Sequence, residues 1–369
     1  MGPDAWAEAK RILAVRLDTI GDVLMTTPAI RALKHSVEGR RVTLLTSTPG
    51  ADIAHLVPEV DEALVHDPVW MKHTPRRDGP GEERAIVAAL KERRFDAAVI
   101  FTVYSQNPLP SALLCHMAGI PLRLAHCREN PYQLLTDWIP EPEPENGVRH
   151  EVRRQLDLVA EVGAVTADDT LSLKVPAVAR RRAMRSLAKA GVDVQRRWIV
   201  VHPGATAPSR RYPPERFAVV GRHLARSEGY QVVFTGTEAE KPLVQKIRAA
   251  MGAPSHSVAG MLALADFAAV IEAAPVIVSN NSGPVHVAAA VDTPVVDLYA
   301  LTNPQHTPWE VPNLVLSHKV PCAYCYKSEC PKGHHQCLRL VEPDEVVDAV
   351  HQLVRRASIR PIRSAGAAL

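Results

Sequence analysis

The chain has 369 residues, of which 46% are hydrophobic and 22% charged, which is ordinary for a folded protein and excludes a disordered or fibrous chain. Because single hydrophobic cores stop growing near roughly 250–300 residues, this length predicts two domains. Lys and Arg number 43 against 40 Asp and Glu, a net charge of +3, and only 5% of the residues are aromatic. A nucleic-acid partner is therefore not expected, since such proteins concentrate positive charge and stacking aromatic side chains.

No stretch has the roughly 20 mostly apolar residues that a membrane-spanning helix needs. The most apolar stretches, 267–278 and 285–301, are interrupted by acidic residues and prolines, and the first ten residues lack the apolar core of a secretory leader. We therefore expect a cytoplasmic protein. In that compartment the six cysteines are not expected to form a disulfide framework.

In the first half of the chain, short apolar runs alternate with stretches of helical spacing. Strands are expected at 11–17, 41–46, 96–101 and 122–125, and helices at 23–34, 82–93, 108–118 and 148–162. Residues 140–147, rich in Pro and Glu, are expected to form an exposed loop. This order predicts a parallel sheet with helices on both faces.

The same pattern restarts in the second half, after a helix that ends at Gly191. Strands are expected at 197–202, 231–235, 275–279 and 294–299, and helices at 213–227, 238–251, 262–273, 283–290 and 344–356. The two halves predict an α/β protein with two Rossmann-like domains, 1–174 and 175–369, whose parallel sheets face a central cleft. The last helix is a candidate to pack back on the first domain. Ligands of such sheets bind beyond the carboxyl ends of the strands.

The first loop with candidate chemistry follows the strand at 11–17 and contains Arg16, Asp18, Gly21 and Asp22. Gly21 permits a turn that residues with a Cβ atom resist. Asp22 opens the next helix, where Asp is a preferred N-cap that satisfies backbone N–H groups. A carboxylate at this position could instead face the cleft as a general base. The spacing leaves both interpretations open.

Two loops of the second half occupy equivalent positions. In the loop after the strand at 197–202, Thr206 and Arg210 stand among small residues, and a hydroxyl and a guanidinium can bind phosphate oxygens. A solvated basic loop is the alternative interpretation. After the strand at 231–235, Glu238 could accept hydrogen bonds from ribose hydroxyls. It would also suit any first helical turn, since acidic residues there favour the helix dipole.

A third loop of this half precedes the short helix expected at 283–290. Asn281, Ser282 and Gly283 stand directly before this helix, whose first N–H groups would attract an anion such as a diphosphate. His286 lies in its first turn, and a single histidine there is interpreted as a core residue.

These four loops together resemble glycosyltransferase family 9, the bacterial ADP-heptose:lipopolysaccharide heptosyltransferases. The matching segments follow the family order and read RLDTIGDVLMTTPAIRAL, HPGATAPSRRYPPERF, FTGTEAEK and SNNSGPVHVAAA. The resemblance is nearest to heptosyltransferase II-like members and implies a GT-B fold. It also implies an inverting, metal-independent transfer of a heptose or related sugar from an ADP-sugar. The implied acceptor is an inner-core sugar of lipopolysaccharide, with at most peripheral contact with the inner membrane face.

The resemblance also implies roles for individual residues. The first domain is implied to bind the acceptor and the second the nucleotide-sugar donor. Asp22 matches the family's proposed catalytic base, which takes the proton of the acceptor hydroxyl, and Arg16, Asp18 and Gly21 belong to the same loop, on the acceptor and phosphate side. Donor binding is implied for Thr206, Arg210, Glu238, Asn281, Ser282, Gly283 and His286. Family members often carry Asp where Asn281 stands here and Lys where Arg210 stands.

Other functions remain open on the sequence alone. A heptosyltransferase-like enzyme could use a protein or a small secondary metabolite as its acceptor instead of a glycolipid. A nucleotide-sugar epimerase has the same two-domain architecture, and a sugar-nucleotide-binding scaffold would need no catalysis at all. A dehydrogenase is disfavoured because the first turn lacks the G-x-G-x-x-G pattern.

Four of the six cysteines are crowded into a short segment, at Cys322, Cys325, Cys330 and Cys337. In a cytoplasmic protein such a cluster favours a metal over disulfides, and four thiolates can close a structural zinc or iron site. The spacing is not that of a standard zinc finger, so reduced cysteines in a loop are the alternative. No cofactor is expected for catalysis. Cys115 and Cys127 are expected to be buried as small apolar residues.

Overall fold

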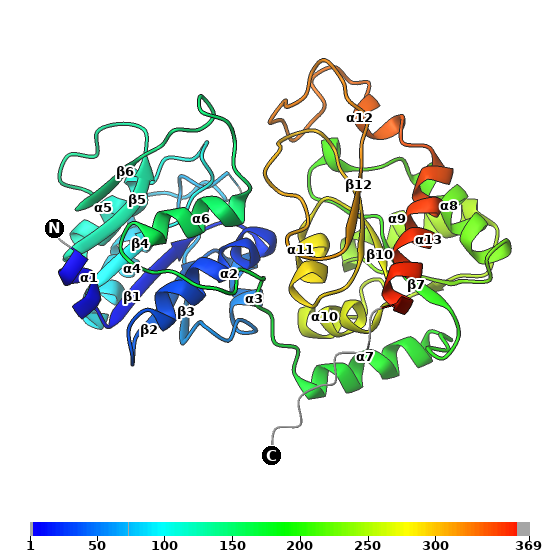
Figure 1. The fold of residues 1–369 in the computed structure, drawn as a ribbon, viewed down its shortest axis with the longest axis horizontal. Coiled ribbons are helices and arrows are strands. Elements are labelled where there is room, and N and C mark those ends of the chain that lie inside the picture. Colours follow the sequence, from blue (N-terminus) through cyan, green and yellow to red (C-terminus); the bar gives the residue numbers. More distant parts are fainter. Residues whose placement is uncertain (1–2, 73, 360–369) are drawn as a thin grey trace. The chain divides into compact units, whose positions relative to one another are not determined.

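The computed structural model describes residues 3–72 and 74–359 and divides into two compact units (Figure 1). The first unit consists of Met1–Lys174 and Pro304–Glu310, and the second of Val175–Asn303 and Val311–Leu369. Each unit contains a six-stranded sheet in which every pair of neighbouring strands is parallel. The predicted α/β class with two Rossmann-like sheets is therefore confirmed.

The first sheet has the order β3-β2-β1-β4-β5-β6. Its strands are β1 (Arg11–Arg16), β2 (Arg41–Thr46), β3 (Glu62–Val65), β4 (Ala97–Ile100), β5 (Leu122–Cys127) and β6 (Asp137–Pro140). The helices of this unit are α1 (Pro3–Glu8), α2 (Ile20–His35), α3 (Thr48–Ala54), α4 (Gly81–Arg93), α5 (Leu109–Met117) and α6 (Glu151–Ala160).

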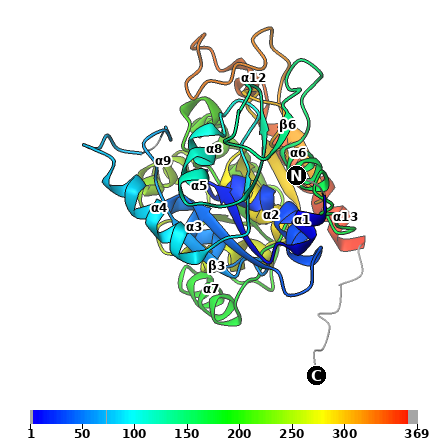
Figure 2. The same cartoon turned by 90° about the vertical axis from the view of Figure 1, so that its left-hand side faces the viewer.

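Helices cover both faces of the first sheet, so its central strands are buried on both sides. α2 packs with α6 on one face, and α4 packs with α5 on the other (Figure 2). Leu13 and Val15 of β1 belong to the same core cluster as Ile86 and Leu90 of α4. Alternate residues of β1 face α2 and α6, since side chains alternate along a strand. Because the strands are parallel, the carboxyl end of β1, after which the candidate residues of this unit lie, is at the same edge of the sheet as the carboxyl ends of its neighbours.

The second sheet has the order β12-β11-β10-β7-β8-β9. Its strands are β7 (Trp198–His202), β8 (Gln231–Phe234), β9 (His256–Ser257), β10 (Ile277–Asn280), β11 (Val295–Leu298) and β12 (Asn313–Leu316). The helices are α7 (Ala177–Lys189), α8 (Pro214–Arg226), α9 (Lys241–Met251), α10 (Leu264–Ala273), α11 (Gly283–Ala290), α12 (Gln336–Arg339) and α13 (Pro343–Ile359). Two short 3-10 helices, η1 (Pro208–Arg210) and η2 (Glu238–Glu240), lie in the loops.

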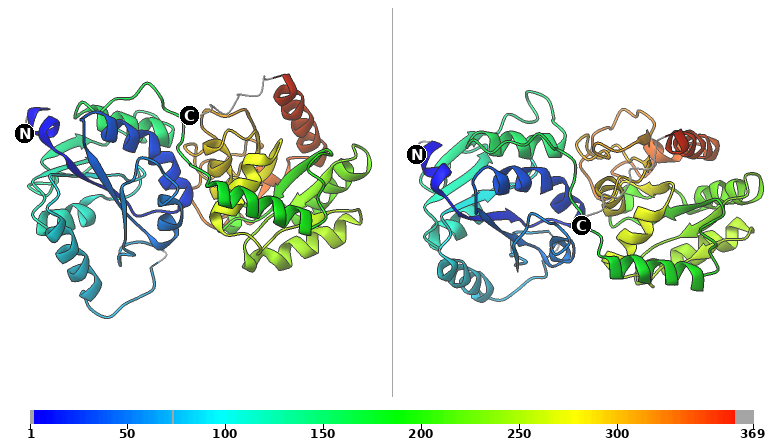
Figure 3. Two further views of the ribbon diagram at one scale, coloured as in Figure 1. Left: turned by 90° about the horizontal axis from the view of Figure 1, so that it is seen from below. Right: turned by 60° about the horizontal axis from the view of Figure 1, so that its bottom comes forward.

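The second sheet is also covered on both faces (Figure 3). Val296 and Leu298 of β11 share a core cluster with residues of α8, α9 and α13. Side chains alternate along a strand, so Val295 and Asp297 point to the opposite face. On that face α11 packs on β10 and β11. The last helix, α13, packs on α8 and beside β12 within this unit. The sequence had suggested the first domain for it, but the segment that joins the first unit is Pro304–Glu310.

The buried central strands lie within two residues of their predicted bounds, whereas several peripheral elements were not predicted. The elements missed were α1, α3, β3, β6, β9, β12 and α12. The strands among them are short and half-exposed, so they lack the continuous apolar run of a buried strand. Among the described residues, no helix is both long and apolar enough to cross a membrane.

Candidate active site

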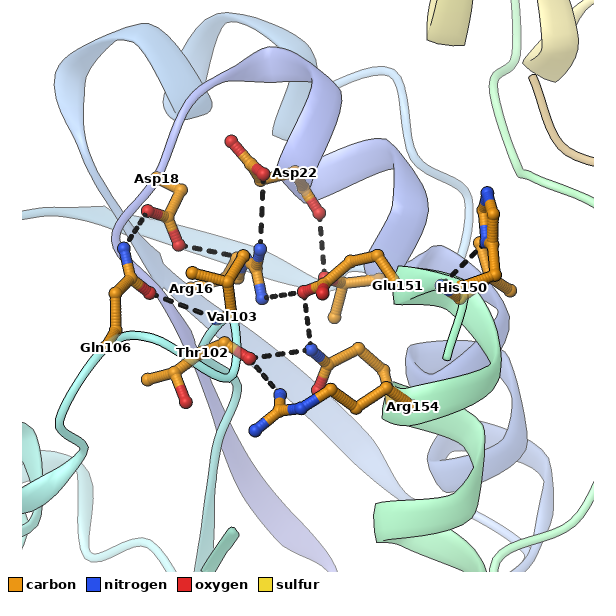
Figure 4. Close-up of polar contacts among 12 residues, drawn as sticks. Arg16, Asp18, Asp22, Thr102, Val103, Gln106, His150, Glu151 and Arg154 are labelled. Atoms are coloured by element: carbon orange, nitrogen blue, oxygen red, sulfur yellow. Dashed lines mark hydrogen bonds and ion pairs between the residues drawn. The ribbon is translucent and has the colours of Figure 1, made fainter. Parts of the chain in front are cut away.

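Arg16 is the centre of a buried charge cluster at the carboxyl end of β1 (Figure 4). Its Nη1 donates to Oε1 of Glu151 at 2.8 Å. Its Nε lies 3.0 Å from Oδ2 of Asp18, and its Nη2 lies 3.3 Å from Oδ1 of Asp22. One fully buried arginine thus holds acidic side chains from a loop and two helices. Such costly clusters are concentrated at functional sites, although structural ones also exist.

Asp22 lies in the first turn of α2, and Thr19 is the N-cap. The interpretation of Asp22 as the N-cap is therefore wrong, and Gly21 lies inside the helix instead of in a turn before it. The backbone N–H and the hydroxyl of Thr19 both donate to Oδ2 of Asp22, at 3.3 and 3.0 Å. Because the Asp22 side chain is 19% exposed, a substrate hydroxyl can approach a carboxylate whose orientation is fixed.

Asp18 is a second carboxyl group of the cluster, and it titrates close to neutral pH. Its Oδ1 accepts a hydrogen bond from Nε2 of Gln106 at 2.6 Å. Burial raises the pKa of Asp18 to about 6; the Asp22 charge acts in the same direction, and Arg16 opposes the shift. The cluster can therefore take up or release a proton near physiological pH.

Two residues that complete this cluster carry no signal in the sequence. Glu151 is fully buried at the start of α6, where Nε2 of Gln155 also donates to its Oε1 at 2.7 Å. Gln106 comes from the loop after β4. Because 135 residues separate Glu151 from Arg16 and 88 separate Gln106 from Asp18, only the fold brings these side chains together.

The start of α6 is itself held by the segment Pro304–Glu310. The N–H of Glu151 donates to the carbonyl oxygen of Gln305 at 3.1 Å. His150, the N-cap of α6, accepts a hydrogen bond at Nδ1 from the N–H of Val152 at 3.2 Å. Its Nε2 lies 2.9 Å from the carbonyl oxygen of Thr307, so Nε2 carries the proton. The segment thereby fixes the helix end that presents Glu151 to Arg16.

In the second unit, the candidate residues follow β7, β8 and β10, which are adjacent in the sheet. In the loop after β7, Thr206 is exposed and Arg210 is half-buried in η1. Arg211 donates from Nε to the carbonyl oxygen of Ala205 at 2.8 Å and so braces this loop. Arg210 is the better candidate of the two arginines to bind an anion.

Asn280, at the end of β10, joins the two ends of the loop after β7. It is fully buried, and its Nδ2 donates to the carbonyl oxygen of Pro203 at 2.8 Å. Its Oδ1 accepts from the N–H of Tyr212 at 2.9 Å. Asn280 is not among the site residues predicted from the sequence, although a polar side chain that ends an apolar strand is a usable signal. Its two buried bonds fix the loop that carries Thr206 and Arg210.

Glu240, not selected from the sequence, lies closer to this loop than the predicted Glu238 does. The Glu238 side chain is 74% exposed and pairs with Nζ of Lys241 at 2.8 Å. Glu240 accepts from the N–H of Thr237 at 2.7 Å and lies against Gly204. A Cβ atom at residue 204 would come within 1.8 Å of Oε1 of Glu240, so this approach requires glycine. The proposed contact of Glu238 with a ribose stays a prediction.

The amino end of α11 has the features of an anion-binding helix start. Ser282 is its N-cap and Gly283 its first residue, and both are half-buried. The N–H of Gly283 lacks an intrahelical acceptor at this position and can therefore bind an anion. Pro284 has no N–H, and the N–H of Val285 donates to the carbonyl oxygen of Ser282 at 3.0 Å. His286 is 4% exposed, as expected for a core residue.

Asn281 is buried beside a carboxyl group that the sequence analysis did not select. Its Nδ2 donates to Oδ2 of Asp297 at 2.9 Å, and Asp297 is fully buried on β11. Burial raises the pKa of Asp297 to about 8, while the hydrogen bond from Asn281 and the charge of Arg210 oppose the shift. Burial therefore favours the protonated form of this group at neutral pH. An acidic residue inside the apolar run at 294–299 is the signal that could have revealed it.

The four clustered cysteines line one small cavity in the second unit, together with Ser209, His334 and His335. The four cysteines are free thiols. Sγ of Cys322 lies 3.8 Å from Nε2 of His334. Burial raises the pKa of Cys337, and the neighbouring thiols act in the same direction. Within residues 3–72 and 74–359, however, no three His, Cys, Asp or Glu side chains form a group that could hold a metal ion. The expected structural metal site is therefore not shown.

The cysteine segment is bonded directly to the loop that carries Arg210. The N–H of Ser209 donates to the carbonyl oxygen of Ser328 at 3.0 Å. The Ser209 hydroxyl donates to the carbonyl oxygen of Lys327 at 2.8 Å. The other two cysteines, Cys115 and Cys127, are buried in the first unit as predicted.

Comparison with known proteins supports the resemblance found in the sequence. Residues 84–336 match the family described as Glycosyltransferase family 9 (heptosyltransferase). The chain is 28% identical over 365 residues to lipopolysaccharide heptosyltransferase 2 of Salmonella typhimurium, covering 95% of this chain and 100% of that relative.

Two solved structures share the fold. The family 9 glycosyltransferase of Veillonella parvula superposes with a TM-score of 0.79 at 20% identity, over 95% of this chain and 98% of that one. The E. coli ADP-heptose lipopolysaccharide heptosyltransferase II gives a TM-score of 0.73 at 24% identity, over 94% of this chain and 99% of that one. The two-sheet architecture described above is thus that of known heptosyltransferases.

Proposed function

Because the chain belongs to glycosyltransferase family 9, we propose that it transfers a heptose from an ADP-sugar to a hydroxyl of the lipopolysaccharide inner core. The names of its relatives support both substrates: one is a lipopolysaccharide heptosyltransferase 2 and another an ADP-heptose heptosyltransferase. In this proposal the reaction takes place at the inner face of the membrane, where the protein needs only peripheral contact.

The orientation of Asp22 is the observation that carries this proposal. Arg16 holds one oxygen of its carboxylate and Thr19 the other, and the side chain stays partly exposed. A carboxylate fixed in this way can take the proton of an acceptor hydroxyl as that oxygen attacks the anomeric carbon. Attack from the side opposite the leaving ADP inverts the anomeric centre.

The second unit offers the groups that the departing diphosphate needs. Charge builds up on the diphosphate in the transition state, and pre-positioned positive groups lower the barrier. Arg210 and the N–H of Gly283 at the start of α11 serve this role in our proposal, with Thr206 as a further hydrogen-bond donor. Asn280 and Asn281 hold these loops in shape.

The test measures heptose transfer from ADP-heptose to inner-core lipopolysaccharide. We expect Asp22→Asn to lower kcat by about 10²- to 10⁴-fold, because the proton acceptor is lost, with ADP affinity unchanged. Asp52→Asn, an exposed acid on α3, is the matched control and should retain full activity. Full activity in Asp22→Asn would remove Asp22 as the base.

The same assay separates the alternative functions. ADP-sugar consumed or epimerised without any acceptor would favour the epimerase. Transfer to proteins or small hydroxyl compounds, but not to lipopolysaccharide, would change the acceptor and keep the donor. Tight ADP binding without turnover on any acceptor would favour the sugar-nucleotide-binding scaffold.

We further propose that Cys322, Cys325, Cys330 and Cys337 hold one structural zinc or iron ion. The support is that all four thiols line one cavity, a donor set that these metals prefer. Desolvation tends to raise the pKa of the partly exposed Cys330, but hydrogen bonds from backbone N–H groups of residues 332–335 lower it overall, which favours the thiolate that a metal requires.

Elemental analysis of the purified protein tests the metal proposal. We expect about one zinc or iron per chain, as four thiolates form one closed site. Cys325→Ser and Cys337→Ser should lose this metal, whereas Cys115→Ala, a buried cysteine of the first unit, should retain it. Protein that contains neither metal after growth with both would refute the site and leave reduced cysteines.

A further inference from the structure

Asp297 occupies an unusual place for an acidic residue, inside a central strand of the second sheet. In the parallel register it pairs with Ser279 of β10, which pairs in turn with His202 of β7. These three polar residues form a row next to the carboxyl edge, on the face that α10 and α11 cover. The ring of His202 packs against Phe267 of α10, which confirms the direction of the row. Asp297 thus lies directly under the proposed donor loops.

The hydrogen bonds of Asp297 are incomplete. Its Oδ2 accepts from Asn281, but its Oδ1 has no hydrogen-bond partner among the described residues, although the side chain is fully buried. Buried polar atoms are rarely left in this state, and the exceptions call for an explanation such as a functional role. An apolar residue would fill the same place in the strand without this penalty. The carboxyl group therefore has a use that packing does not explain.

The two residues that Asp297 influences are both proposed to bind the donor. Asn281 is held through its amide, and Arg210 is close enough for its charge to act on Asp297. An ionised carboxylate here would attract the Arg210 guanidinium and repel a diphosphate. An uncharged carboxyl group does neither, yet it keeps its hydrogen bond to Asn281.

We propose that Asp297 is a positioning residue of the donor site, which anchors the Asn281 amide at the amino end of α11 and governs whether Arg210 is available to the donor diphosphate. This inference rests on the proposed function, because it assumes an ADP-sugar donor. Asp297 acts through its two neighbours and does not contact the donor itself. Ionisation of the carboxyl group above about pH 8 would turn Asp297 into a competitor of the diphosphate for Arg210.

Two substitutions separate the two parts of this role. Asp297→Asn stays uncharged at every pH and can still accept a hydrogen bond from Asn281. We expect it to keep the ADP affinity of the wild type at pH 7. Asp297→Ala loses the anchor, and we expect the KM for the ADP-sugar to rise about tenfold, the loss of one buried hydrogen bond, with kcat changed much less.

The pH profile of ADP binding is the readout that a purely structural role would not change. Between pH 8 and 9.5 we expect the wild-type affinity to fall by at most about 15-fold in total, since a single ionising group approaches tenfold per pH unit only well above its pKa. Asp297→Asn should lack this decrease. Other titratable groups on β7, α10 and α11 are present in both proteins, so their effects on the two pH profiles are the same. These groups are His202, Asp266, Glu272 and His286.

Control variants make the outcome decisive. Asp266→Asn removes another buried acid of the same unit, on α10, and should change neither ADP affinity nor its pH profile. In an Arg210→Ala background, the decrease above pH 8 should be smaller, because the competition for the guanidinium is gone and only the repulsion between the carboxylate and the diphosphate remains. Thermal unfolding of each variant verifies that it is folded.

Equal pH profiles for the wild type and Asp297→Asn would overturn the inference, as would unchanged donor KM in Asp297→Ala. A failure of the proposed function would give different results. The wild type would then bind no ADP, or Arg210→Ala would leave ADP affinity unchanged.

Discussion

His126, at the end of β5, is a buried histidine whose ionisation opposes folding. Its side chain is 4% exposed. Burial lowers the pKa of His126 to about 4, and the positive charge of Arg154 acts in the same direction, while Glu141 opposes it. In an unfolded chain the pKa of histidine is about 6.5. Between these two values the unfolded chain takes up a proton that the folded protein does not, so stability falls as the pH is lowered.

We expect His126 to contribute a loss of up to about 3 kcal/mol in the free energy of unfolding between pH 7.5 and 4. His126→Gln should remove this contribution, so the variant should lose less stability than the wild type between pH 7.5 and 5. Urea unfolding at both pH values measures the difference. His116→Gln, an exposed histidine on α5, is the control and should behave as the wild type does. Equal losses in wild type and His126→Gln would contradict the prediction.

Single residues could be predicted where their neighbours in the chain define their setting. Asp22 and Arg210 lie in the segments that follow the buried strands β1 and β7, so their place near a sheet edge could be inferred from the local pattern. Glu151 and Asp297 could not be assigned to a site in this way. Glu151 reaches Arg16 only because α6 packs on α2, and Asp297 meets Asn281 only through the register of β10 and β11. Contacts of this kind depend on the whole fold.

At the scale of elements, the loop between β7 and α8 depends on one side chain from β10. Asn280→Ala would leave the Pro203 carbonyl oxygen and the Tyr212 N–H without their buried partner. We expect this variant to lose about 1–3 kcal/mol in the free energy of unfolding and to bind ADP more weakly. Urea unfolding and ADP titration measure the two effects.

A second variant and a control separate the bonds of Asn280 from a general effect of the substitution. Asn280→Asp keeps an acceptor for the Tyr212 N–H but places a buried carboxyl oxygen against the Pro203 carbonyl oxygen, so its loss of stability should be at least that of Asn280→Ala. Asn313→Ala removes a half-buried asparagine from the edge strand β12 and should leave ADP binding unchanged. If Asn280→Ala matched the wild type in both measurements, the loop would not depend on this clamp.

The elements themselves could be predicted where burial is complete. β1, β4, β7, β10 and β11 are buried along almost their whole length, and such strands appear as continuous apolar runs. β3, β9 and β12 are short and partly exposed edge strands, in which no such run forms. The start of α2 was placed three residues late because Thr19, not Asp22, provides its N-cap. Which residue caps a helix depends on local geometry that composition does not specify.

At the scale of the whole molecule, the repeated strand and helix pattern was enough to predict two Rossmann-like sheets. It was not enough to predict that Pro304–Glu310 returns to the first unit. That segment forms neither helix nor strand, and Trp309 holds it through contacts that no periodicity reveals. The Trp309 ring lies 4.5 Å from that of His150, and its Nε1 donates to the carbonyl oxygen of Asp169 at 2.8 Å.

This returning segment has a consequence for how the gene can be recombined. The backbone of Gln305 and Thr307 secures the start of α6, which carries Glu151, the buried partner of Arg16. A chimera joined at residue 174 would inherit its first unit from one parent and this segment from the other. The chain therefore offers no single crossover point at which the two halves separate cleanly. Recombination between related genes can keep the Arg16 cluster intact only if codons 304–310 are transferred together with codons 1–174.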